Sequence, residues 1–209
     1  MRWIVLFLAL IIGCVSASAG PGYPDPEVIG PRFKSEFFST QVSTFGFEPA
    51  QYIGDFKTEG WQQLIDDKSK NKKETNEVYY FVNTKPYRGV VVLIQSSTGY
   101  YYPLKKDDLP AQVPLFKDNV EYHLPFTEYI SIDYLPVDKG VADELFRRTG
   151  GVDPKDLLLA RVVSRVHKEN HRISFIYFTT TPREGSGPSI REFYQESQDN
   201  MNIFQAGGE

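Results

Sequence analysis

Apolar and aromatic residues are concentrated in short runs through the middle of the chain, separated by polar turns. Residues 90–95 form an apolar run that is typical of a central strand buried on both faces. Residues 78–82 are β-branched and aromatic, and residues 129–135 alternate between apolar and polar positions. Further short strands are expected within 32–47, 100–102, 120–124 and 173–178. This pattern predicts a mainly antiparallel sheet of about six to seven strands.

Helical spacing of apolar residues occurs in two segments before residue 150. Residues 58–68 have apolar positions at helical intervals, and Thr58 is a suitable cap. Residues 138–149 begin with the N-cap residue Asp138 and are followed by two glycines that can end a helix. Both segments are therefore expected to be helices.

Two further helices are expected towards the C-terminus. Asp153 and Pro154 provide a cap and a first helical residue for a segment that extends to about residue 168. Ser189 and Glu192 fit a capping box that opens a helix over 190–200. The sequence thus predicts an α+β fold in which three to four helices pack largely on one face of the antiparallel sheet.

The composition of the chain divides it into four parts. Residues 1–19 are expected to be a signal peptide, 20–31 an extended lead-in rich in proline and glycine, and 32–181 a single α+β domain. Residues 182–209 are expected to form a linker, a C-terminal helix and a frayed tail. The charged, apolar-free segment 66–77 is interpreted as a solvated connection; two small subdomains meeting there are the alternative.

The N-terminus carries a secretory pattern. Arg2 precedes an apolar run of about 13 residues, which is shorter than the roughly 20 needed to span a membrane. Small residues follow, and the sequence Ala17-Ser18-Ala19 fits a signal-peptidase site. We therefore expect a secreted, extracellular protein. A lipid anchor on Cys14 is the alternative, because residues 11–14 resemble a bacterial lipoprotein cleavage box.

Composition and charge exclude several classes of protein. The chain has 209 residues, 41% of them hydrophobic, and a formal net charge of −4. This mild acidity argues against a nucleic-acid-binding protein, which is usually basic. No second apolar run approaches membrane length, so no transmembrane segment is expected. Cys14 is the only cysteine, and its loss with the signal peptide would leave neither a disulfide nor a thiol nucleophile.

No set of residues has the pattern of a catalytic, metal or cofactor site. His167 and His171 would share one face of a continuous helix, but the neighbouring cations oppose metal binding and the helix is expected to end there. Ser186 lacks the full nucleophile motif, and the paired aspartates at 66–67 and 107–108 are neighbours in loops. Glycine-rich phosphate loops are absent. We predict no catalytic residue, no metal ligand and no cofactor.

Tyrosine is abundant in the expected strands. Neighbouring strand residues point to opposite faces, so the tyrosines cannot all be buried in one core, and some are expected on an outer surface or in a cavity. The sequence therefore predicts a non-enzymatic binding protein for an extracellular protein, a glycan or a small apolar ligand. A hydrolase based on His123, His167 or His171 and a structural protein of an extracellular layer are the alternatives. The candidate binding residues are Tyr79, Tyr80, Tyr100, Tyr101, Tyr102 and Tyr122.

Overall fold

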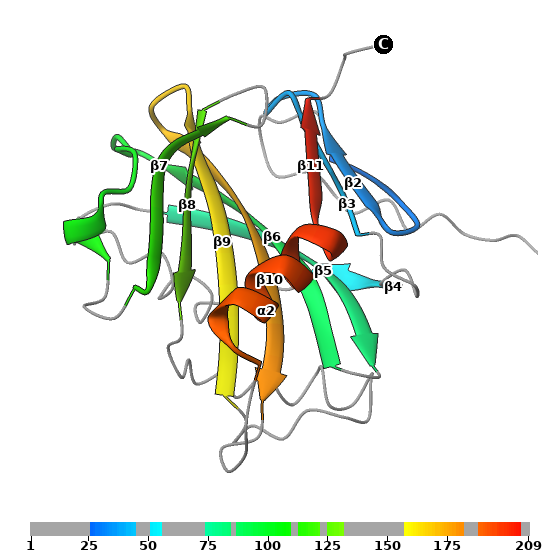
Figure 1. The fold of residues 1–209 in the computed structure, drawn as a ribbon. Coiled ribbons are helices and arrows are strands. Elements are labelled where there is room, and N and C mark those ends of the chain that lie inside the picture. The colour runs from blue at the N-terminus through cyan, green and yellow to red at the C-terminus, as the bar shows by residue number, and fades with distance from the viewer. Residues whose placement is uncertain are drawn as a thin grey trace, which may run out of the picture.

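The structure is a computed structural model of the whole chain. It describes residues 26–44, 51–55, 74–84, 87–109, 113–121, 125–131, 157–181 and 188–205. Most of these residues are in β-strands, which form two antiparallel sheets (Figure 1).

The large sheet has seven strands in the order β4-β5-β6-β10-β9-β8-β7, and every neighbouring pair is antiparallel. The hairpin of β9 and β10 pairs through β10 with β6, so the centre of the sheet joins segments far apart in the sequence. Its strands are β4 (Gln51–Asp55), β5 (Glu74–Thr84), β6 (Tyr87–Ser97), β7 (Leu115–Glu121), β8 (Pro125–Ser131), β9 (Leu157–His167) and β10 (His171–Thr181).

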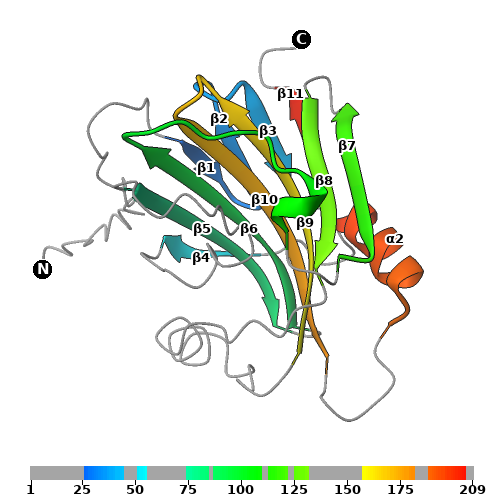
Figure 2. The same ribbon diagram turned by 90° about the vertical axis from the view of Figure 1, so that its left-hand side faces the viewer.

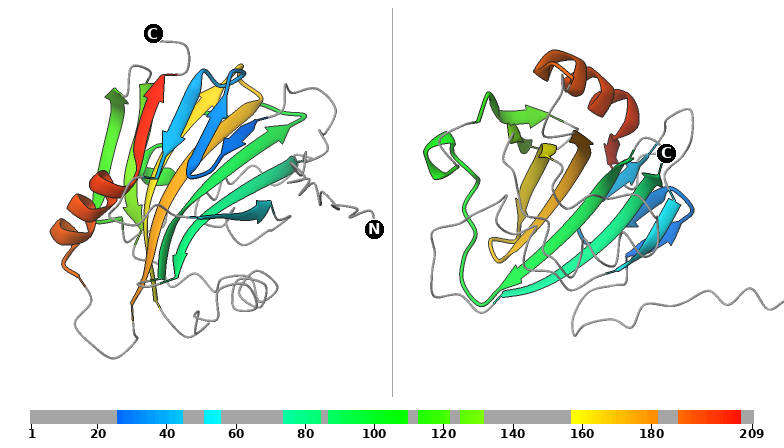
Figure 3. Two further views of the ribbon diagram at one scale, coloured as in Figure 1. Left: turned by 90° about the vertical axis from the view of Figure 1, so that its right-hand side faces the viewer. Right: turned by 90° about the horizontal axis from the view of Figure 1, so that it is seen from below.

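The small sheet combines strands from both ends of the described chain. Its order is β1-β2-β3-β11, and β11 pairs antiparallel with β3 (Figure 3, left). The strands are β1 (Glu27–Ile29), β2 (Arg32–Ser35), β3 (Thr40–Ser43) and β11 (Asn202–Gln205).

The described residues contain one α-helix, α2 (Ile190–Asn200), and one turn of 3-10 helix, η2 (Lys106–Asp108). The predicted capping box is confirmed: the Ser189 hydroxyl accepts from the Glu192 amide at 3.3 Å, and the Glu192 carboxylate accepts from the Ser189 amide at 2.8 Å. These hydrogen bonds lower the pKa of Glu192 below its usual range. No helix in the described ranges has the length and apolar character needed to cross a bilayer.

The central strands of the large sheet are buried on both faces. We call one the helix face: α2 lies in front of β9 and β10 (Figure 1), and Phe193 of α2 and Phe33 of β2 belong to the same buried cluster as Val92 and Phe175 of the sheet. Alternate strand residues point to this face or to the opposite one. Because both sets of alternating side chains in β6 are buried, apolar residues are favoured at every position, which explains the continuous apolar run in this strand.

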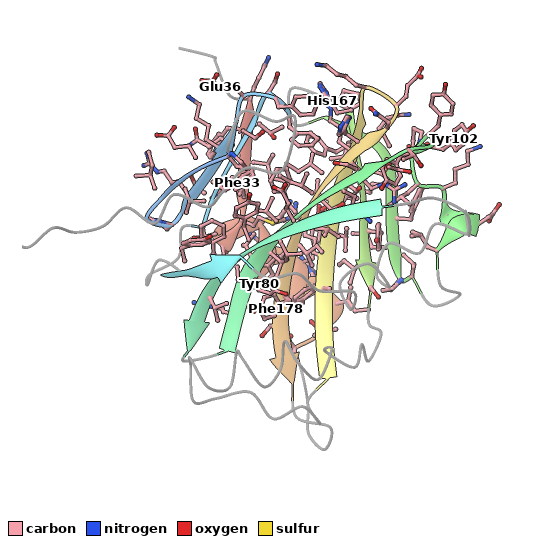
Figure 4. All side chains as sticks on the ribbon, turned by 180° about the vertical axis from the view of Figure 1, so that it is seen from behind. Phe33, Glu36, Tyr80, Tyr102, His167 and Phe178 are labelled. Carbon is pink, nitrogen blue, oxygen red and sulfur yellow. The ribbon has the colours of Figure 1, made fainter. Side chains whose placement is uncertain are left out.

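We call the opposite side the loop face. Leu104 and Leu109, which follow β6, pack there against strand residues that include Tyr80 and Phe178. Figure 2 shows the segment between β6 and η2 crossing the sheet beside β10 and β9, and Figure 4 views the molecule from this side. The two faces give the protein two buried apolar clusters separated by the large sheet.

The predicted α+β class is wrong, because the described residues form two sheets and a single α-helix rather than three to four helices on one sheet. The segment expected to be a helix up to residue 168 forms strand β9 over Leu157–His167. Val162 points to the loop face and Val163 to the helix face, so both faces of the strand are apolar. Pairing with β8 and β10 overrides the local helix signals.

Other predicted elements agree with the structure or lie outside the described residues. Strands are present, with longer bounds, at 78–82, 90–95 and 173–178, and two short ones lie within 32–47. The described parts of the strands expected at 120–124 and 129–135 lie in β7 and β8. Residues 100–102, expected to start a strand, are irregular, whereas β1, β4 and β11 were not expected. The helices expected at 58–68 and 138–149 lie outside the described residues.

Candidate functional site

Three segments meet at one end of the large sheet. They are the β2–β3 turn (36–39), the segment after β6 (98–106) and the β9–β10 turn (168–170); together we call them the tip surface. The amide of Tyr101 donates to the carbonyl of Glu169 at 2.5 Å, and the amide of Ser97 donates to that of Asn170 at 3.0 Å. The ammonium of Lys168 lies 4.6 Å from the centre of the Phe37 ring. The hydrogen bonds and the ring contact hold the three segments together.

Three consecutive tyrosines on this surface have different environments. Tyr101 is buried, whereas Tyr100 and Tyr102 are 61% and 70% exposed. The Arg172 guanidinium lies 4.5 Å from the centre of the Tyr101 ring and donates to the Tyr102 carbonyl at 3.4 Å. Burial of the middle side chain anchors the backbone between the two outer ones (Figure 4 labels Tyr102). Tyr100 and Tyr102 are therefore presented to solvent by a fixed segment.

Exposed charges of both signs surround these tyrosines. Among the side chains whose exposure the structure describes on the tip surface and the adjoining η2 turn, three lysines and three carboxylates are exposed, so these six together favour neither a strongly anionic nor a strongly cationic partner. They are Lys105, Lys106, Lys168, Glu36, Asp107 and Glu169.

The β9–β10 turn has strained backbone. Lys168 and Glu169 have φ angles of 47° and 60°, in the left-handed region that residues other than glycine seldom occupy. Such strain is retained where the surrounding structure fixes the backbone, and it is more common at functional sites than elsewhere. The Tyr101 hydrogen bond to Glu169 is one interaction that fixes this turn.

The structure separates the six tyrosines predicted from the sequence. Tyr79 is buried on the helix face and Tyr80 on the loop face, so neither forms part of an outer surface. Tyr101 is buried beneath the tip surface, and Tyr122 lies outside the described residues. Of the five that the structure describes, only Tyr100 and Tyr102 are available to a partner in solution.

His167 and His171 are neighbours, but not on a helix. They face each other across the β9–β10 hairpin, where their Cα atoms are paired. The Nδ1 atom of His167 accepts from Arg165 Nη2 at 3.4 Å, so this imidazole is oriented by a cation and not by the carboxylate that a general base uses. Burial lowers the pKa of both histidines, and nearby Lys168 lowers it further. The third histidine, His123, lies outside the described residues.

No group of three or more metal-ligating side chains is present among the described residues. Of the aspartates considered for catalysis, Asp107 is exposed and on η2, whereas Asp66 and Asp67 lie outside the described residues. Ser186 also lies outside them.

A buried ionic network was not predicted from the sequence. Arg161 of β9 donates through Nε to the Glu128 carboxylate of β8 at 2.5 Å, and both side chains are 1% exposed. Arg161 also donates to the hydroxyl of Ser197 in α2, and Lys117 donates to the hydroxyl of Tyr194 at 2.6 Å. The network joins α2 to the sheet, and the burial of its central pair is typical of a structural role. No periodic pattern in the sequence marks an arginine that points inward.

A second contact joins α2 to the middle of the sheet. The Glu196 carboxylate accepts from Arg88 Nη1 at 2.9 Å and from the Tyr177 hydroxyl at 2.7 Å. Burial and the hydrogen bond to Glu196 raise the pKa of Tyr177 above its usual range. Tyr177 therefore stays neutral and donates to Glu196.

Comparisons with protein-family models, with curated proteins and with solved structures find no match to this chain.

Proposed function

We propose that the protein is a secreted, non-enzymatic binding protein that contacts an extracellular protein partner through Tyr100 and Tyr102 of the tip surface. The observation that carries the proposal is the exposure of these two side chains on either side of the buried Tyr101. Tyrosine combines a large apolar body with a polar hydroxyl, and it is enriched at protein interfaces.

The anchoring of the segment supports this function. A surface that is already ordered loses less conformational entropy when it binds, so more of the contact energy appears as affinity. Tyr101 provides that order through its buried ring over Arg172 and its hydrogen bond to Glu169. The exposed charges of both signs around the tyrosines suit the polar rim of a protein interface.

The localisation is part of the proposal. It depends on the signal-peptide pattern of residues 1–19, and N-terminal sequencing of the protein recovered from the culture medium tests it. A mature N-terminus near Gly20 is expected. A chain retained in the cell with residues 1–19 attached would contradict it.

The binding experiment compares three proteins immobilised on the same support: the wild type, Tyr100→Ser/Tyr102→Ser, and Phe204→Ser. Phe204 is 44% exposed on β11, so its substitution is a matched control for the loss of an exposed aromatic side chain outside the tip surface. The probe is the mixture of proteins secreted by the cells that produce this protein. Each protein that the immobilised wild type retains is then purified and titrated against all three immobilised proteins. A tyrosine hot spot contributes about 2 kcal/mol or more, which is about thirtyfold in Kd, so the double variant should raise the Kd by at least about thirtyfold.

Two results would contradict the proposal. In one, the double variant keeps the wild-type affinity for every retained protein. In the other, Phe204→Ser weakens binding as much as the double variant does. Circular dichroism and thermal unfolding of the three proteins show whether the substitutions leave the fold intact. Tyr80→Ser and Tyr101→Ser are unsuitable for this test because both side chains are buried.

A further inference from the structure

We propose that Phe37, His167 and His171 form a pH-sensitive clasp, which joins the small sheet to the tip of the β9–β10 hairpin while both imidazoles are neutral and releases it when they are protonated. This inference concerns the contact between the two sheets and does not depend on the proposed partner.

The geometry of the clasp joins two elements that are distant in sequence. Phe37 lies in the β2–β3 turn, and its ring centre is 4.8 Å from that of His167 and 5.0 Å from that of His171, both nearly edge-on. Phe38, the next residue, lies 5.6 Å from His167 and is buried in the cluster on the helix face. Figure 4 shows His167 at the end of β9, on the side of the β2–β3 hairpin. One aromatic ring is thus packed against two imidazoles from a different sheet.

The neighbouring charges oppose protonation of these imidazoles. From β9, Arg165 donates through Nη2 to His167 Nδ1 at 3.4 Å and through Nη1 to the Phe38 carbonyl at 3.2 Å. From the β9–β10 turn, the ammonium of Lys168 lies over the Phe37 ring. Two cations therefore surround the pair before either histidine takes up a proton.

The carboxylates of the same elements do not compensate for these cations. Glu36 in the β2–β3 turn is 78% exposed and lies 3.6 Å from Lys34, and Glu169 in the β9–β10 turn is exposed. The electrostatic neighbours that shift the pKa of His167 are Arg165, Lys168 and His171, and for His171 the neighbour is Lys168. All of them disfavour the protonated form.

Protonation also removes a hydrogen bond. His167 Nδ1 accepts from Arg165 only while that nitrogen carries no proton. A protonated His167 would present an N–H group to the Arg165 guanidinium. A protonated His171 would face the protonated His167 across the hairpin. The two protonated histidines then lie beside the two existing cations, Arg165 and Lys168, and the four positive charges repel one another.

The direction of the pH effect follows from the two lowered pKa values. The released or unfolded chain has histidines with the usual pKa of about 6.5 and binds protons more readily than the closed clasp. The stability that the clasp contributes is complete above about pH 6.5 and is lost as the pH falls through the lowered values. Mildly acidic conditions are therefore expected to release the β2–β3 turn.

The test is an NMR titration of the purified chain from about pH 7.5 to about pH 4.5. The ring C–H shifts report the protonation of each histidine, and hydrogen exchange, corrected for the intrinsic pH dependence, reports the opening of the turn. We expect both histidine pKa values below 6.5 and a fall of about tenfold in the protection of amides 36–42 between about pH 7 and about pH 5. Amides of β5 and β6 should keep their protection, because their hydrogen bonds lie far from the clasp.

His167→Gln/His171→Gln provides the control, because glutamine stays neutral throughout the titration. The variant should show no pH dependence of exchange in residues 36–42. The proposal is overturned if the wild-type histidines titrate at or above 6.5, if protection of the turn is unchanged at acidic pH, or if the variant keeps the pH dependence. The first two results come from the wild type alone, so the test does not require the variant to fold.

Discussion

The buried ion pair between Glu128 and Arg161 allows a quantitative prediction. Both side chains are 1% exposed, so removal of either partner leaves the other group in an environment that water does not reach. We consider Glu128→Leu, Arg161→Met and the double variant. The exposed pair Lys34 and Glu36, 3.6 Å apart, is the matched control for an ion pair in solvent.

The magnitude follows from the burial. Breaking a buried pair by removing one partner costs about 3–5 kcal/mol, and replacing both partners by apolar residues is often close to neutral. After Arg161→Met, Lys117 still lies 3.9 Å from the Glu128 carboxylate and partly compensates its charge, whereas Glu128→Leu removes the carboxylate that pairs with Arg161. We therefore expect Glu128→Leu to cost about 5 kcal/mol, Arg161→Met about 3 kcal/mol, and the double variant less than either.

These free energies correspond to measurable shifts. A change of 1 kcal/mol moves the Tm of a chain of this length by about 2–4 °C. The expected decrease is about 10–20 °C for Glu128→Leu and about 6–12 °C for Arg161→Met. Urea unfolding followed by far-UV circular dichroism gives the free energy of unfolding of the wild type, the two single variants and the double variant. Lys34→Met should change the stability by less than about 0.5 kcal/mol.

Additivity would refute the reasoning. If the double variant loses the sum of the two single losses, the partners do not depend on each other and the pair is not a coupled unit. A loss below about 1 kcal/mol for Glu128→Leu would show that water or another group stabilises Arg161 after the substitution.

Two further pairs of substitutions test the packing and the helix cap. Gly89→Ala would place a Cβ against the carbonyl oxygen of Phe81 and 3.1 Å from the Phe178 ring, so we expect the free energy of unfolding to fall by about 3 kcal/mol. Gly30 has open space around it, so Gly30→Ala should cost only about 1 kcal/mol, because of its φ of +54°. Equal losses in denaturant unfolding would contradict this explanation. Ser189→Ala should cost about 1 kcal/mol and Ser189→Asp almost nothing, measured by thermal unfolding; equal losses would exclude a capping role.

Some elements could be predicted because their local signals agree with their tertiary environment. The apolar run at 90–95 lies in β6, which has a partner strand on each side and a buried cluster on each face. The Ser189 capping box forms because the helix that it opens is amphipathic, with Phe193 and Ser197 buried and Arg191 and Glu192 exposed. In both cases the sequence pattern and the packing point to the same structure.

β9 could not be predicted, for a physical reason. Arg161 lies in the segment that was expected to be a helix up to residue 168, yet it belongs to a strand, points into the core and pairs with Glu128. A pattern of polar and apolar positions cannot show that a charged residue has a buried partner on another strand. The same limit applies to tyrosine: only the fold shows that Tyr101 is buried and that Tyr100 and Tyr102 are not.

The strand order has a consequence for synthesis on the ribosome. β6 and β10 are adjacent at the centre of the large sheet, but residues 98–170 separate them in the chain. β6 therefore emerges with an unpaired edge, and the cluster on its helix face stays incomplete until α2 and β11 follow. Folding that waits for distant segments is slow, and open strand edges invite pairing with other chains. We expect nascent chains that end before residue 171 to aggregate or to need chaperones, and full-length chains to be released from them.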